Sequence, residues 1–261
     1  MTTIQLIDTH CHLDDTQFDH DRETVLKNCL SQGISEIVVP GISRARWDRT
    51  LDICRRYSSL HPALGLHPMF MDEHRQAHIE ELTQQLHQHR LIAIGEIGLD
   101  FYAGKTQATS QLHFFEQQLD IAASHHLPVL LHVRKAHEET LQLLRKKNLT
   151  GGIVHAFSGS YEQAKQYVNL GFKLGFGGTL TYERSHKLHR IARQLPIDAI
   201  VLETDAPDMT VSQHRGERNS PEYLRYCLQA LSEVRNTPAT EIAHATSANA
   251  EKIFNFSLKQ Y

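Results

Sequence analysis

The chain is organised around the stretch Asp8-Thr9-His10-Cys11-His12, close to its start. The apolar run at residues 4–7 that precedes it predicts a buried strand. Two histidines separated by one residue at the end of an extended segment point to the same side of the backbone, so both imidazoles can reach one cation. Cys11 between them is expected to point away. Because the chain contains 19 histidines, this pair predicts a metal site only if the other acids and histidines support it.

Short apolar stretches alternate with helical patterns along the whole chain. Strands are predicted at residues 4–7, 36–39, 63–66, 91–95, 128–131, 152–154, 172–175 and 199–202. Helical patterns are predicted at residues 19–32, 44–58, 73–89, 107–126, 136–147, 161–170, 183–194, 221–233 and 238–254. Strands that alternate with helices indicate a parallel sheet. Eight such units in 261 residues favour the α/β class and a closed (β/α)₈ barrel, formed as a single domain over residues 1–261.

Side chains that can bind metal stand where these predicted strands end. They are His10 and His12 after the first strand, His67 after the third, Glu96 after the fourth, His132 after the fifth, His155 after the sixth and Asp205 after the eighth. The carboxyl ends of barrel strands open on one face, where active sites lie. A lone histidine is more often hydrogen-bonded in a core, but this repeated placement predicts one metal-binding mouth. Histidines within helical patterns, such as His74, are expected on the surface.

The residue types of this cluster indicate divalent cations and hydrolysis. Imidazole with carboxylate suits zinc, manganese or similar metals better than calcium. These side chains are too many ligands for one tetrahedral site and match two cations, of zinc, manganese or magnesium, that share a carboxylate. Two such cations about 3.5–4 Å apart can generate a bound hydroxide near neutral pH and orient a phosphoryl or acyl group. Asp205 is the candidate general base. Glu203 and Asp8 are expected in the layer behind the ligands.

The composition limits the compartment and the mode of binding. The net charge is −3, so any nucleic-acid binding must use a local basic patch. The start of the chain lacks the basic and apolar regions of a signal peptide, and no apolar run approaches the roughly 18 residues of a membrane span. We therefore expect a cytoplasmic monomer without an obligate protein partner or a membrane. The four cysteines show no C-x-x-C spacing and are expected as reduced thiols: Cys11, Cys29, Cys54 and Cys227.

Motifs along nearly the whole chain carry a family resemblance. They are Asp8-Thr9-His10-Cys11-His12-Leu13, Gly65-Leu66-His67-Pro68, Gly95-Glu96-Ile97-Gly98-Leu99-Asp100-Phe101-Tyr102, Pro128-Val129-Leu130-Leu131-His132-Val133-Arg134, His155-Ala156-Phe157-Ser158-Gly159 and Glu203-Thr204-Asp205-Ala206-Pro207. On these motifs the sequence resembles the TatD family of metal-dependent deoxyribonucleases, within the amidohydrolase-like barrels. The resemblance implies that one cation is bound by His10, His12 and Asp205, the other by His132 and His155, with Glu96 bridging them and His67 contacting the substrate.

Basic and aromatic residues after the strands bear on the substrate. Arg134 follows the fifth strand, and Arg215 and Arg218 lie in the long loop after the eighth. Guanidinium groups suit bidentate phosphate contacts. Aromatic rings can stack on a terminal base; the candidates are Phe101, Tyr102 and Phe157.

Three functions remain open on the sequence. The leading hypothesis is a two-metal exonuclease that acts on DNA ends. The alternative is a deacylase or amidohydrolase of a small metabolite or aminoacyl-tRNA, because the same fold and cations can attack a carbonyl carbon. The third is a metal-binding barrel without catalysis, which the complete ligand set and the retained Asp205 argue against.

Overall fold

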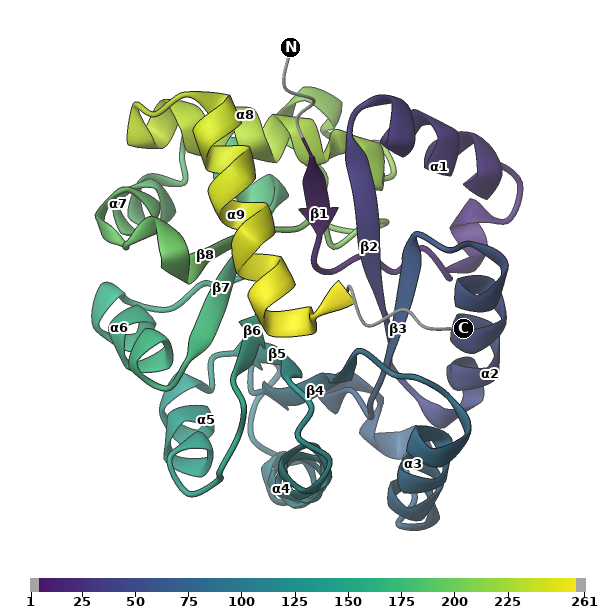
Figure 1. Cartoon of the computed structure of the whole chain (residues 1–261). Coiled ribbons are helices and arrows are strands. Elements are labelled where there is room, and N and C mark those ends of the chain that lie inside the picture. The colour runs from purple at the N-terminus through teal and green to yellow at the C-terminus, as the bar shows by residue number, and fades with distance from the viewer. Residues whose placement is uncertain (1–4, 257–261) are drawn as a thin grey trace.

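A computed structural model describes residues 5–256, so Ile4 of the predicted first strand lies outside the described residues. Eight parallel strands form one sheet in chain order, and helices surround it (Figure 1). The strands are β1 (Leu6–Asp8), β2 (Ile34–Gly41), β3 (Leu60–Leu64), β4 (Ala93–Asp100), β5 (Val129–Arg134), β6 (Gly152–Val154), β7 (Phe172–Phe176) and β8 (Ile200–Leu202). The predicted (β/α)₈ barrel is confirmed.

The helices follow the predicted order closely. They are α1 (Arg22–Ser31), α2 (Arg44–Arg56), α3 (Ala77–Gln88), α4 (Ala108–Ser124), α5 (His137–Leu144), α6 (Tyr161–Asn169), α7 (His186–Gln194), α8 (Leu224–Arg235) and α9 (Ala239–Phe254). Short 3₁₀ turns fill several loops, among them η2 (Pro68–Glu73), η3 (Gly178–Thr181) and η5 (Ser212–His214). Throughout residues 5–256, each helix is too short or too polar to span a lipid bilayer.

The ring closes between β1 and β8. The Thr9 amide donates to the Leu202 carbonyl (3.1 Å), and the Asp205 amide donates to the His10 carbonyl (2.8 Å). Two of the predicted metal ligands therefore belong to the residues that close the barrel, and their backbones are fixed by the closure itself.

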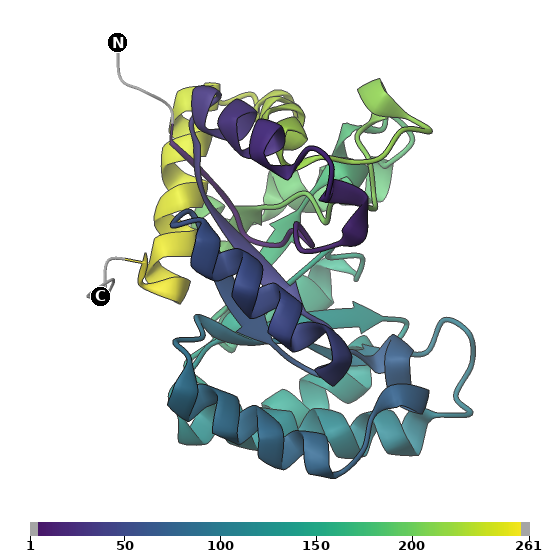
Figure 2. The same cartoon turned by 90° about the vertical axis from the view of Figure 1, so that its right-hand side faces the viewer.

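One end of the barrel is plugged by α9. Ala250 and Phe254 of this helix pack against a buried layer that takes one residue from most of the strands: Ile7, Val38, Ala63, Ala93, Leu130, Ile153 and Val201. Figure 2 shows α9 along one side of the barrel and the loops that follow the strands on the opposite side. Because the plug is apolar and continuous, the polar chemistry of the barrel is confined to the other end.

Two predicted boundaries were wrong in an instructive way. Glu96 and His132 do not end their strands, because β4 continues to Asp100 and β5 to Arg134. The pairing of these strands shifts register between Ile94 and Ile97. At Gly98 φ is +146°, and a Cβ atom there would lie 2.0 Å from the His132 carbonyl oxygen. Only glycine permits this close approach, which brings β4 against the His132 backbone.

The expected surface position of His74 was also wrong. This residue ends η2 and is buried, with its Nε2 2.9 Å from the His67 carbonyl oxygen. The ring therefore braces the loop that carries His67. Helical periodicity could not reveal this, because the contact depends on how η2 folds back under the mouth.

Candidate metal centre

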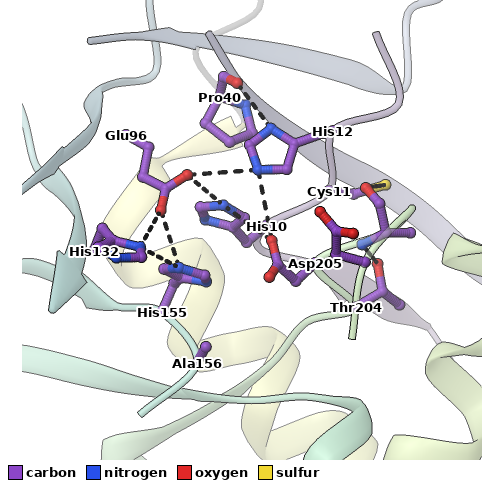
Figure 3. Close-up of polar contacts among 12 residues, drawn as sticks. His10, Cys11, His12, Pro40, Glu96, His132, His155, Ala156, Thr204 and Asp205 are labelled. Carbon is purple, nitrogen blue, oxygen red and sulfur yellow. Dashed lines mark hydrogen bonds and ion pairs between the residues drawn. The ribbon is translucent and has the colours of Figure 1, made fainter. Parts of the chain in front are cut away.

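Glu96 lies at the centre of a ring of histidines (Figure 3). Its Oε2 faces His10 Nε2 at 3.1 Å and His12 Nε2 at 3.5 Å. Its Oε1 faces three other ring nitrogens at 3.0–3.1 Å: His67 Nε2, His132 Nδ1 and His155 Nε2. Each carboxylate oxygen thus serves its own set of imidazoles. All the predicted ligands except Asp205 meet at this one side chain.

Asp205 completes the cluster from the loop after β8. Its Oδ1 lies 3.5 Å from His12 Nε2 and 3.7 Å from His10 Nε2. Three overlapping sets of potential ligand atoms result, each within 4.8 Å: His10, His12 and Glu96; His10, His155 and Asp205; and His67, Glu96 and His132. Cys11 points away from the cluster, as alternation predicts (Figure 3). Its thiol faces the Ala206 carbonyl.

The outer nitrogens of two histidines fix which nitrogen faces the centre. His12 Nδ1 donates to the Pro40 carbonyl at 3.3 Å, and His132 Nε2 donates to Asp100 Oδ2 at 2.9 Å. In the neutral ring the other nitrogen then carries a lone pair, and each lone pair faces a carboxylate oxygen. The lone pair and the carboxylate oxygen repel each other unless a proton or a cation lies between them. Outer partners of this kind are typical of metal-ligating histidines, so the donor set fits divalent cations.

His67 differs from these two in its protonation. The Met69 amide donates to His67 Nδ1 at 3.1 Å, so the proton of the neutral ring sits on Nε2. That nitrogen donates to Glu96 Oε1. His67 is therefore arranged as a hydrogen-bond donor rather than as a ligand, which agrees with the substrate contact that the resemblance implies.

The two carboxylates of the cluster, Glu96 and Asp205, favour positive charge beside them. Burial raises the pKa of Glu96, but His67, His155 and His10 outweigh it and hold that pKa well below its usual range. Burial likewise raises the pKa of Asp205, and His155 with His12 reverses the shift to a lowered value. Burial lowers the pKa of His155, yet Glu96 and Asp205 raise it to about 10. The two carboxylates thus stay ionised and keep a proton on a neighbouring imidazole, and a bound cation can take the place of that proton.

Asp8 and Glu203 lie behind the ligands, in the layer where they were expected. Asp8 accepts from the Thr204 amide, the Thr204 hydroxyl and the His10 amide. It therefore joins β1 to the segment that carries Asp205. Glu203 accepts from the Ala156 amide, and its Oε1 lies 3.8 Å from His155 Nδ1. Both acids are fully buried.

Comparison with known proteins agrees with this centre. A family model described as TatD related DNase matches residues 7–255.

The chain belongs to the TatD family.

Its relatives in this family are named as hydrolases. The chain is 39% identical over 254 residues to YjjV of Escherichia coli K12, an uncharacterized metal-dependent hydrolase, covering 96% of this chain and 98% of YjjV. It is 33% identical over 257 residues to YabD of Bacillus subtilis 168, which has the same description, covering 97% and 100%. The crystal structure of YjjV matches with a TM-score of 0.93 and 38% identity over 97% of this chain and 99% of that one. This chain is therefore a metal-dependent hydrolase of the TatD family.

The three arginines expected to contact phosphate lie in different surroundings. Arg134 is exposed at the end of β5, with its guanidinium 3.7 Å above the exposed ring of Tyr102. Arg215 is exposed in the loop after β8. Arg218 instead forms a two-bond ion pair with Asp21 (3.0 and 2.6 Å), at the start of α1. A free loop charge is therefore the wrong description of Arg218.

The aromatic side chains expected to stack on a base also differ in their exposure. Tyr102 is 63% exposed, whereas Phe101 and Phe157 are buried. Tyr102 is therefore the most exposed of the three rings that were expected to stack on a base.

Asp100 is a site residue that the predicted strand ends left out. It lies on the same face of β4 as Glu96 and holds His132 through Nε2. The signal was present, since alternation places residues 96, 98 and 100 on one side of a strand. A strand that ends at Glu96 would not include Asp100, whereas β4 continues to that residue.

Replacing Asp100 by asparagine should weaken metal binding by about 10–100-fold, the usual effect of removing an outer partner of a ligand. The amide can offer Nδ2–H to His132, which allows the ring to reverse its protonation and turn a protonated nitrogen towards Glu96. Metal affinity measured by calorimetry checks this, with Asp120→Asn on the outer face of α4 as the matched control. Equal affinity of the wild type and Asp100→Asn would show that Asp100 does not orient His132.

Proposed function

We propose that this TatD-family hydrolase is a deoxyribonuclease that removes nucleotides from DNA ends with two divalent cations. The observation that supports two cations is the central carboxylate. Glu96 presents one oxygen to His10 and His12 and the other to His132 and His155. The family description and the basic residues at the mouth support DNA as the substrate.

We assign one cation to His10, His12 and Asp205 and the other to His132 and His155, with Glu96 shared. Nitrogen and oxygen donors without thiolate suit zinc or manganese. When bound, such a pair lowers the pKa of water towards 7 and stabilises the charge that develops on a phosphoryl group.

The residues of the chain have separate roles in the proposed hydrolysis. Asp205, whose pKa is lowered, is ionised at neutral pH and accepts the proton of the attacking water. His67 carries its proton on Nε2 beside Glu96 and donates it in a hydrogen bond to a phosphate oxygen of the substrate. Arg134 and Arg215 bind phosphates further along the strand, and Tyr102 offers a face for stacking a base.

The test of this proposal is a salt titration of DNA binding with end-labelled DNA on the metal-loaded protein. Arg134→Ala and Arg215→Ala together should lower the slope of log K against log salt by about 0.7–0.9 for each phosphate that the protein no longer binds. The matched control removes two arginines from the opposite end of the barrel, Arg55 and Arg56 at the end of α2. Both double variants remove the same charge, so only a local interaction with DNA separates them.

Two results would contradict the proposal. The first is an equal slope for the two double variants. The second is rapid hydrolysis of an ester or amide substrate that survives removal of Arg134 and Arg215, with no cleavage of DNA ends. The latter favours the deacylase.

A further inference from the structure

A cavity of about 380 Å³ opens beside the metal centre. Its walls come from the loop after β6, from the end of β7 with η3, from α7 and from the residues that follow β8. Asp205 lines it, so a molecule bound in the cavity lies next to a predicted metal ligand. Volumes of roughly 300–1,000 Å³ are usual for small-molecule sites.

Three glycines let the segments that form the wall pack closely together. A Cβ atom at Gly175 would lie 2.0 Å from Glu203 Oε2, and one at Gly178 would lie 2.1 Å from the Met209 carbonyl oxygen. At Gly177 the nearest atom would be the Glu203 carbonyl oxygen at 3.0 Å. Larger residues at these positions would push the segments that follow β7 and β8 apart. The remaining walls are largely apolar, with Phe176, Leu188 and Ile191 among them.

A buried carboxyl group lies behind the cavity wall. Glu203 is fully buried, and its Oε2 has no hydrogen-bond partner within the part of the chain that the structure describes. Its other oxygen is taken by the Ala156 amide. The Oε2 atom lies against Gly175, where an added Cβ atom would approach it to 2.0 Å, so Glu203 supports the inner wall of the cavity from behind.

The outer rim carries positive charge. Arg184 and Lys187 are exposed and line the cavity, and Lys187 Nζ donates to the Ser158 carbonyl at 2.9 Å. Neither residue was identified from the sequence, because helical spacing makes them look like ordinary solvated charges. They differ from ordinary surface charges because they line the same cavity as Asp205.

We propose that this cavity binds the nucleoside attached to the phosphate under attack, with Arg184 and Lys187 binding the next phosphate of the strand. The inference rests on the proposed nuclease function and deepens it. Asp205 places the scissile group at the inner edge, and the apolar walls accept a base and sugar. The cationic rim complements the phosphate that follows.

The experiment compares two phosphodiesters with the same leaving group, thymidine 5′-(p-nitrophenyl phosphate) and methyl p-nitrophenyl phosphate. The wild type should prefer the nucleoside ester in kcat/KM by about tenfold or more, as expected when an apolar pocket is filled. Ser158→Trp fills the mouth of the cavity and should remove most of this preference while turnover of the methyl ester stays within about twofold. The matched control is Ser124→Trp at the exposed end of α4, which should keep the preference.

The rim is tested separately with the dinucleotide pTpT. Lys187→Ala and Arg184→Ala should each raise its KM by about 3–10-fold and leave the methyl ester unchanged. Arg190→Ala is an exposed control on the same helix as Lys187. If the Lys187 and Arg184 variants match this control, the rim does not bind phosphate.

Failure of the cavity proposal can be distinguished from failure of the proposed function. Hydrolysis of both esters without preference, or an equal preference in Ser158→Trp and Ser124→Trp, overturns the cavity proposal and leaves the nuclease standing. If the metal-loaded wild type cleaves neither ester, the cavity proposal is tested without catalysis, by measuring the binding of thymidine 5′-monophosphate with calorimetry. Absence of that binding in Ser158→Trp supports the proposal, and unchanged binding refutes it.

Discussion

Replacing Asp205 by asparagine should lower hydrolysis by about 10²–10⁴-fold, the usual effect of removing a general base. The substitution keeps the shape of the side chain. At this residue φ is +57°, a conformation that asparagine also tolerates. The backbone bond from the Asp205 amide to the His10 carbonyl stays in place. The fold and the barrel closure should therefore survive, and the defect should fall on proton transfer.

The measurement is kcat of metal-loaded protein with the metal content determined in the same sample. Asp208→Asn is the matched control, since it lies exposed three residues further along the same loop. It should keep near wild-type turnover. If Asp205→Asn holds the metal and turns over as fast as Asp208→Asn, another group is the base.

Replacing Glu96 by glutamine should abolish stable metal binding. The decrease in affinity should exceed the roughly 10–100-fold effect of an outer partner, because both carboxylate oxygens of Glu96 face imidazole nitrogens. An amide supplies only one oxygen and turns its NH₂ group towards the other set of rings. Activity should fall with the metal content.

The metal-free variant gives a second, independent readout. Burial lowers the pKa of His155, and Glu96 is the largest influence that raises it, to about 10. Without that charge the pKa of His155 should fall, so the ring should lose its proton at a lower pH in an NMR titration. Glu116→Gln on the outer face of α4 is the control. An unchanged pKa of His155 would show that Glu96 does not control the charge of the cluster.

The alternation of apolar strands with helical patterns and the polar residues at strand ends were enough to predict the barrel. They also predicted that His10, His12, Glu96, His132, His155 and Asp205 would meet. This succeeds because a parallel barrel brings the carboxyl ends of its strands to one face, whatever the details of packing. Local pattern and topology together therefore placed the cluster, although they put the ends of β4 and β5 too early.

Tertiary structure decided what surrounds the ligands. Asp100 reaches His132 because β4 and β5 continue side by side beyond the predicted ends, with Gly98 allowing the close approach. Asp21 lies 197 residues before Arg218 in the chain, and the ion pair between them means that Arg218 is not a free cation. Glu203, Arg184 and Lys187 line one cavity only because three loops meet beside Asp205. Strand periodicity is a property of neighbouring residues, whereas these contacts depend on register and loop packing between segments far apart in the chain.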